Sequence, residues 1–402
     1  MNPTPAARAS QRTREVRTAA QLGWPLLVSL LTVGLAGGCS DRSVSSPASH
    51  NDSQSGSTHV LTWRGMNYDV GLWSPPWVGT VVPALPFDAT RTRREMAVIK
   101  NDLHCNAVKI TGHKADDLIA ATEAALDQEL EVWLVPHLVD GTADETLDYT
   151  VEIARRAEGL RSEHSKLVMV VGVEATLFMK GILDLPGDTF MDRLNSPDFV
   201  RVVSSGRHNA RLNAYLVRVA AAVREVFHGP LTYGSIPELE EVDWGPFDYV
   251  GIDYYREEQN HKSYPDRLAG YRRFGKPVVV LETGVCTYRG AEKLGPNASF
   301  AILDPATELV KTDLVRDEAM QARELTDILG KLEDAEADGI FVYTFVQPYM
   351  PHNPSEPRYD FDLGSFGIVK SLIGTHGTTY PDLPWEPKAS FAAVAEFFGR
   401  HD

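Results

Sequence analysis

The chain is short of cysteine and of positive charge. Its 402 residues include three cysteines, and 39 lysines and arginines stand against 55 aspartates and glutamates, for a formal net charge of −16. This negative charge argues against a nucleic-acid or anionic-membrane partner. It fits a neutral substrate, and a soluble acidic surface is the simpler interpretation. The histidines and cysteines also lack the close spacing of metal ligands, so we expect no metal and no other cofactor.

Long apolar runs are also scarce, and the clearest one lies near the N-terminus. Residues 24–35 form a run that is too short to span a bilayer comfortably, and four arginines between positions 8 and 17 precede it. A basic segment followed by a short apolar segment is typical of an export signal. We therefore exclude this stretch from the prediction of the fold.

The export signal ends in Leu35-Ala36-Gly37-Gly38-Cys39, which resembles a bacterial lipobox, whose cysteine is lipidated and becomes the mature N-terminus. The leucine stands one place further upstream than is usual, and a plain signal peptide cut near Gly38 is the alternative. Residues 40–58 are rich in Ser, Asn, Asp and Gly, as flexible tethers are. We expect a leader over 1–38, a tether over 39–58 and one catalytic domain over 59–402. A lipid on Cys39 would hold that domain at the outer face of the cell membrane, and a secreted protein is the alternative.

A glycine-rich phosphate-binding loop is absent as well. The first predicted strand is followed by Asn67-Tyr68-Asp69-Val70-Gly71, which cannot hold a phosphate as a doubly wound nucleotide-binding sheet does. Apolar, strand-like segments then alternate with amphipathic, helix-like segments. Strands are predicted at 60–66, 106–111, 131–135, 167–173, 231–236, 249–252, 277–281 and 340–345, and helices at 90–103, 115–130, 142–160, 209–227, 264–274, 317–337 and 388–399.

Eight strands with helices between nearly all of them predict a single (β/α)8 TIM barrel with long loops after its strands. Cys105 precedes the second strand and Cys286 follows the seventh, so the two cysteines should lie at opposite ends of the barrel. A disulfide needs Cα atoms within about 7 Å of each other, and we therefore expect two free thiols.

Two of the predicted strands end in a glutamate. Glu174 follows the apolar run 168–173, and Glu282 follows the apolar run 278–281. Such runs are typical of parallel strands buried on both faces, and the carboxyl ends of barrel strands form the catalytic face. Two carboxyl groups on that face, one as acid/base and one as nucleophile, are what retaining glycoside hydrolysis requires. We expect about 5–5.5 Å between them.

Other polar side chains gather at the remaining strand ends. Burying them costs free energy unless they pair, so their clustering predicts a substrate-binding site. Glu238 is the alternative acid (the reserve acid) should Glu174 not serve, although a solvated loop carboxylate is the simpler interpretation of it. His113 and His137 suit loop hydrogen bonds as well as contacts to a substrate. Three tryptophans suit either sugar stacking or loop packing: Trp73, Trp77 and Trp244. The candidate binding residues are Asn67, Tyr68, Asp69, Lys109, His113, His137, Glu238, Asp253, Tyr254 and Tyr255.

Together these residues resemble the large clan of retaining (β/α)8 glycosidases, which includes cellulase- and mannanase-like enzymes. That clan places its acid/base glutamate after the fourth strand and its nucleophile after the seventh, and Leu281-Glu282-Thr283-Gly284 is similar to its nucleophile signature. The resemblance implies cleavage of a β-linked glycan by double displacement, with Glu282 as nucleophile and Glu174 as acid/base. Lys109, Tyr254 or Tyr255 would keep Glu282 ionised, and Glu282 together with burial would keep Glu174 protonated.

A narrower resemblance comes from Met66-Asn67-Tyr68-Asp69 and from residues 102–108. Both are similar to a group of actinobacterial proteins labelled "abortive infection protein", and that label describes no chemistry.

Two positions depart from the glycosidase clan. The asparagine that usually precedes the acid/base glutamate and bonds the sugar 2-hydroxyl is replaced by Val173, and the usual tryptophan of the eighth strand is missing before Thr344. The alternative function is therefore a non-catalytic, carbohydrate-binding barrel lipoprotein. No sequence pattern indicates the sugar, its linkage or the oligomeric state.

Overall fold

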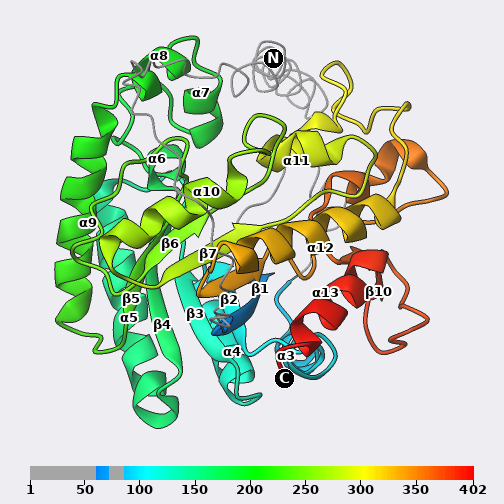
Figure 1. The fold of residues 1–402 in the computed structure, drawn as a ribbon, viewed down its shortest axis with the longest axis horizontal. Helices are drawn as coiled ribbons and strands as arrows, with labels where there is room; N and C mark the ends of the chain where they lie inside the picture. The colour runs from blue at the N-terminus through cyan, green and yellow to red at the C-terminus, as the bar shows by residue number, and fades with distance from the viewer. Residues whose placement is uncertain (1–59, 72–85) are drawn as a thin grey trace, which may run out of the picture.

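The computed structural model describes residues 60–71 and 86–402, which form a closed (β/α)8 barrel. Eight parallel strands follow one another around the barrel in sequence order, and β1 pairs with β8 to close it (Figure 1). The leader, the tether, Cys39, Trp73 and Trp77 lie outside the described residues. The strands are β1 (Trp63–Asp69), β2 (Ala107–Gly112), β3 (Glu131–Pro136), β4 (Leu167–Val173), β5 (Leu231–Ser235), β6 (Val250–Asp253), β7 (Val278–Thr283) and β8 (Gly339–Val342).

The predicted strands and helices are all present, with ends that differ by a few residues. The longest differences are at three helices: the one predicted over 115–130 ends at Leu126, the one predicted over 142–160 continues to His164, and the one predicted over 264–274 turns into a 3-10 helix at Gly270. The outer helices are α3 (Ala89–Asn101), α4 (Ala115–Leu126), α5 (Ala143–His164), α9 (His208–Arg224), α10 (Tyr264–Ala269), α12 (Glu318–Asp334) and α13 (Ala389–Gly399). Within the described residues, no helix has the length and apolar character needed to cross a bilayer.

Large apolar side chains fill the interior of the barrel beneath the carboxyl ends of the strands. Trp133 lies 5.1 Å from Phe341 and 5.2 Å from Tyr249, measured between ring centroids. Side chains alternate between the two faces of a strand, so every second residue beyond an inward-facing one also faces the interior of the barrel. That alternation directs Lys109 of β2 and His137 after β3 into the top of the barrel, where both are buried.

The pairing of the strands is irregular next to Glu174, Asp253 and Glu282. The register shifts between Val170 and Val173 on β4, at Asp253 on β6, and between Val280 and Thr283 on β7. Such irregularities are common near active sites because they redirect side chains at the end of a strand. On β7 the shift lets Glu282 reach the site although its neighbour Leu281 already faces the barrel interior.

The long segments after β4 and β7 carry additional short helices above the carboxyl ends of the strands. In Figure 1 they lie in the upper part of the view. The segment after β4 forms α6 (Ala175–Phe178), α7 (Phe190–Leu194) and α8 (Phe199–Ser204), and the segment after β7 forms α11 (Ala298–Ala301). Cys105 and Cys286 are buried free thiols, one before β2 and the other after β7.

The loop after β8 is fixed by ion pairs. Arg316 contacts Asp360 at 3.0 Å and Asp362 at 2.8 Å, and the buried Lys388 contacts the other oxygen of Asp362 at 2.9 Å. These pairs join the loop to the segments that lead into α12 and α13. The loop therefore has a defined position at the rim, where it supplies part of the site.

Candidate active site

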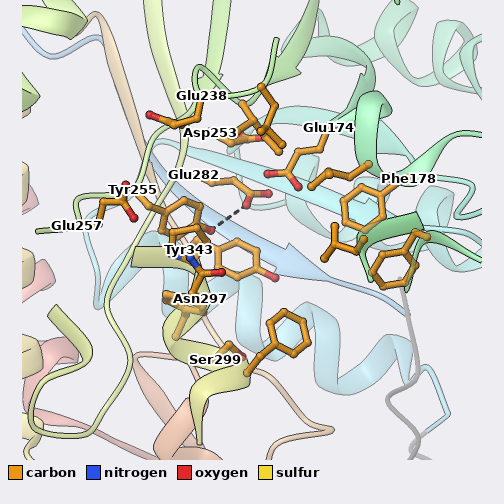
Figure 2. A pocket seen from close by; sticks show the side chains of 18 of the residues that line it. Glu174, Phe178, Glu238, Asp253, Tyr255, Glu257, Glu282, Asn297, Ser299 and Tyr343 are labelled. Atoms are coloured by element: carbon orange, nitrogen blue, oxygen red, sulfur yellow. Dashed lines mark hydrogen bonds between the residues drawn. The ribbon is translucent and has the colours of Figure 1, made fainter. Parts of the chain in front are cut away.

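Three carboxyl groups meet at the carboxyl end of the barrel. Glu174 follows β4, Asp253 ends β6 and Glu282 lies on β7, and an oxygen of each lies within 4.8 Å of an oxygen of the others. Figure 2 shows the carboxylates of Glu174 and Glu282 turned toward one another, with Asp253 beside them. Glu174 and Glu282 are the pair expected from the sequence, and Asp253, expected there as a binding residue, lies close to both of their carboxyl groups.

Glu282 is held by two donors. The ammonium group of Lys109 donates to Oε1 at 2.5 Å, and the hydroxyl of Tyr255 donates to Oε2 at 2.9 Å. Tyr254, the other tyrosine considered, stacks on Tyr264 outside the barrel and donates to its backbone carbonyl at 2.8 Å. The partner of Glu282 from this pair of adjacent tyrosines is thus Tyr255.

Glu174 has an unusual backbone that its neighbours fix in place. Its φ of 49° and ψ of 41° lie in the left-handed region, which costs a non-glycine residue about 1–2 kcal/mol. The Glu174 amide donates to the carbonyl of Gly234 at 2.8 Å, and the next amide, of Ala175, donates to the hydroxyl of Tyr233 at 2.7 Å. Glu240 accepts from that hydroxyl and from the amide of Thr176. This buried network directs the Glu174 side chain into the site.

Glu174 and Glu282 have different surroundings. Burial, followed by the charges of Asp253 and Glu282, raises the pKa of Glu174 well above its ordinary value. Lys109 acts in the opposite direction on Glu174, but it makes its direct contact with Glu282. Glu174 therefore keeps its proton to higher pH than an ordinary glutamate, while Glu282 has an ammonium group and a phenol as hydrogen-bond donors.

Asp253 is buried, and neither of its oxygens has a hydrogen-bond partner among the described residues. Burial, and next to it the charge of Glu282, raises the pKa of its carboxyl well above the ordinary value. A carboxyl with a raised pKa favours the folded state when it is protonated, and this contribution is lost as the pH rises through the folded-state pKa.

We therefore expect Asp253→Asn to be more stable than the wild type at neutral pH and equal to it near pH 4. The difference should grow with pH, because only the wild-type carboxyl has to ionise in its buried position. Urea unfolding at several pH values measures it. The matched control is Asp148→Asn, which changes an exposed carboxylate within α5 and should show no such dependence on pH. A difference that does not change with pH would contradict the burial argument.

Lys109 supplies the positive charge of the cluster. It is fully buried, and although burial acts against its charged form, Glu282 and Asp253 raise the pKa of Lys109 above its ordinary value.

Lys109→Met should destabilise the fold by about 3–5 kcal/mol, because it leaves buried carboxylates without their cation. The double variant Lys109→Met/Glu282→Gln should recover part of that loss. Equal unfolding free energies for the single and double variants in urea would show that the pair is not coupled.

Asn67 and His137 also face the site. Asn67 donates to the carbonyl of Leu281 at 2.9 Å, while its side-chain oxygen has no partner among the described residues. Both ring nitrogens of the buried His137 are likewise unpartnered there. Burial, with a smaller effect of Lys109, lowers the pKa of His137 to about 3, so its ring is neutral. A neutral imidazole with free nitrogens is suited to bonding a substrate hydroxyl.

Other candidates lie away from the three carboxyl groups. The hydroxyl of Tyr68 bonds Glu95 on α3, and His113 is exposed and bonds the carbonyl of Gly71. Glu238 accepts from Arg267 at 2.8 Å and lines the rim of the larger cavity described below, on the side of Asp253 (Figure 2). Asp69 accepts from the amide of Gly71 at 2.6 Å and lines the smaller of two cavities described below. Trp244 is buried against Phe247 in the connection between β5 and β6, as the loop-packing interpretation predicts.

Two tyrosines at the site are absent from the sequence-based candidates. Tyr343 stands where the eighth-strand tryptophan of the glycosidase clan is usual, and its ring lies 6.2 Å from that of Tyr255. Tyr349 lies in the loop after β8 and accepts from the side-chain amide of Gln347 at 3.0 Å. Gln347 is one of the polar residues that follow the predicted eighth strand, and both it and Tyr349 line the larger cavity described below. The position before Thr344 was the one sequence signal for Tyr343, and Tyr349 had none.

Two cavities meet at the carboxyl groups. A smaller one, of about 100 Å³, is lined by polar groups that include Asn67, Asp69, Thr111 and His137. A larger one, of about 280 Å³, extends beneath α7, α8 and α11. Glu174, Glu282, Phe178 and Tyr343 line both cavities. The carboxyl pair thus lies at the junction of a small polar space and a larger apolar one.

Comparison with known proteins supports the fold. No family model matches the sequence, and no curated protein matches it either. Solved structures that resemble it include two described as GH113 beta-1,4-mannanase, with TM-scores of 0.51 and 0.50 at 13% and 12% identity, each match covering 85% of this chain and 99% of the other. A beta-glucuronidase of Parabacteroides merdae matches with a TM-score of 0.51 at 14% identity over 84% of this chain and 36% of its own. The barrel is therefore of a kind found in glycoside hydrolases.

Proposed function

We propose that this protein is a retaining glycosidase that cleaves a β-linked, neutral glycoside. The observation that carries the proposal is the approach of Glu174 and Glu282, with oxygens within 4.8 Å, in unlike surroundings at the ends of β4 and β7. Retaining glycosidases need carboxyl groups about 5–5.5 Å apart, whereas inverting enzymes need about 6.5–9.5 Å to admit a water.

The mechanism follows from the two environments. Glu282 attacks the anomeric carbon and forms an ester to the sugar, while Glu174 gives its proton to the departing oxygen, which leaves as an alcohol. Glu174, now ionised, removes a proton from water as that water attacks the same carbon, the ester bond breaks and Glu282 is regenerated. Lys109 and Tyr255 position the Glu282 carboxylate for the attack.

The charges of the site favour a neutral sugar. Three carboxyl groups face the junction, and the buried Lys109, whose ammonium group lies beside them, already contacts Glu282. Neither cavity is lined by an arginine or lysine among the described residues. A uronic acid would bring a further negative charge without a partner, which is costly in a site with little water. The β-linkage is supported by the mannanases of like fold, whose descriptions specify β-1,4 bonds.

Hydrolysis of a panel of 2,4-dinitrophenyl β-glycosides, followed by proton NMR, tests this proposal. The first product should be the β-anomer of the free sugar, and a 2-deoxy-2-fluoro glycosyl fluoride should add one sugar mass to the peptide that contains Glu282. The α-anomer as first product, or a label on another residue, would overturn the double displacement.

A non-catalytic, carbohydrate-binding barrel is the second candidate, and Val173 favours it. This buried side chain stands directly before Glu174, where an amide that bonds the sugar would be expected, and it offers no hydrogen bond. Binding of sugars by calorimetry without turnover of any activated glycoside would support this alternative.

Attachment to the membrane through Cys39 is also part of the proposal. It is supported by the lipobox-like sequence and by the Ser-rich segment that precedes the described barrel. In a bacterial host, Cys39→Ala should move the protein from the membrane fraction to the soluble exported fraction, because one residue carries the whole anchor. Ser40→Ala is the matched control and should leave the protein with the membranes. Equal membrane content of both variants would contradict a lipid on Cys39.

A further inference from the structure

One wall of the larger cavity differs in chemistry from a site for a sugar chain, whereas polar side chains such as Glu238, Asn260, Asn297 and Gln347 line other parts of the cavity. Its wall on the side of Glu174 consists of Phe178 on α6, Met191 and Leu194 on α7, and the more deeply buried Phe190 and Phe199. Phe300 on α11 faces the same space. These side chains have no hydrogen-bonding groups, so hydroxyls of a bound sugar would lose their water contacts without replacement.

The position of this apolar wall relative to Glu174 indicates which part of a substrate the wall contacts. The acid/base residue must lie against the departing oxygen, and Phe178 is four residues after Glu174 on the short helix that Glu174 begins. Figure 2 shows Phe178 on the side of Glu174 that faces away from Glu238 and Glu257. The departing group, and not the sugar that becomes attached to Glu282, therefore lies against the apolar wall.

The smaller cavity is suited to the sugar ring of the substrate. The side-chain oxygen of Asn67 and both ring nitrogens of His137, which have no hydrogen-bond partner in the part of the chain that the structure describes, suit the hydroxyls of one sugar ring. The two spaces together accommodate a molecule with a single polar ring at one end and an apolar chain at the other.

We infer that the substrate class is a glycoside of one neutral sugar on an alkyl or similar lipid chain, with the chain bound along Phe178, Met191, Leu194 and Phe300. This inference rests on the proposed glycosidase function. It also separates this protein from a polysaccharide hydrolase, whose departing group is itself a sugar.

A homologous series of methyl, butyl, hexyl and octyl β-glycosides, used below their micelle concentrations, tests the inference. The sugar is the one that the dinitrophenyl panel selects. Each methylene that enters the cavity should raise kcat/KM about fourfold, so that hexyl should exceed methyl by about 10²- to 10³-fold. The oligosaccharide with the same sugar at its end should be a poorer substrate than the octyl glycoside. A flat series, or a preference for the oligosaccharide, would overturn the inference and leave the glycosidase function intact.

Two variants sharpen the test. Met191→Gln keeps the length of a half-buried side chain in the wall and adds an amide, and it should reduce the gain from methyl to hexyl by tenfold or more. Val217→Gln makes a comparable apolar-to-polar change at an exposed position of α9 and should leave the series unchanged. Equal series for both variants would show that the chain does not lie on this wall.

If no glycoside is turned over, calorimetric binding of the same series to the wild-type protein still decides the question. Affinity that increases with chain length in the wild type and not in Met191→Gln would support the apolar chain site while the glycosidase function fails. Affinity that is independent of chain length would overturn both.

Discussion

Glu282→Ala is expected to lower kcat/KM for a dinitrophenyl β-glycoside by at least about 10⁴-fold, since the covalent step has no other nucleophile. Asp253 is the nearest carboxyl, but burial raises its pKa and neither of its oxygens is held by a donor among the described residues. Lys109 and Tyr255 both donate to Glu282 and not to Asp253. Asp253 is therefore a poor substitute for the missing group.

Azide provides the diagnostic readout for the Glu282 variant. The alanine leaves a space beside Lys109 into which a small anion fits, and azide should attack there to give a glycosyl azide of inverted, α configuration. Glu238→Gln, a change to the rim carboxylate that pairs with Arg267, is the matched control and should keep activity within about threefold of the wild type. Loss of activity in Glu238→Gln with retention in Glu282→Ala would transfer the catalytic role to the reserve acid.

The barrel was predictable because its strands carry a strong local pattern. Runs such as 167–173 and 278–281 are apolar and β-branched, and each precedes a polar residue at the carboxyl end of a parallel strand. The same pattern identified Glu174 and Glu282 without any knowledge of which strands are neighbours. The order of the units along the chain then indicated that they meet at one rim.

Other features depend on geometry that no local pattern encodes. Strict alternation would direct Glu282 away from the interior that Leu281 faces, and only the register shift on β7 brings both to the inner side. The choice between Tyr254 and Tyr255 likewise depends on the shift at Asp253. The closeness of Asp253 to the pair, the network around Glu240 and the apolar wall after β4 involve contacts between segments far apart in sequence, which a single sequence does not specify.

Glu174→Gln should produce a loss that depends on the leaving group. An alkyl glycoside needs a proton on its departing oxygen, and its kcat/KM should fall by about 10²- to 10⁴-fold, the usual contribution of a general acid. Dinitrophenolate leaves without a proton, so kcat/KM for that substrate should change less than about tenfold, while kcat falls because the base for the second step is missing. Steady-state kinetics with both substrates, with Glu238→Gln as control, measure the difference.

The pH dependence of kcat/KM tests the role of Glu174 independently. Glu174 must be protonated in the first step, and burial together with Asp253 and Glu282 raises its pKa, so wild-type kcat/KM for an alkyl glycoside should hold through mildly acidic pH and fall as the pH rises through that pKa. Glu174→Gln has no proton to lose and should lack this alkaline limb. Asp253→Asn removes one of the charges that raise the Glu174 pKa, and the limb should therefore move to lower pH. A limb that persists in Glu174→Gln, or that moves to higher pH in Asp253→Asn, would assign the proton to a different group.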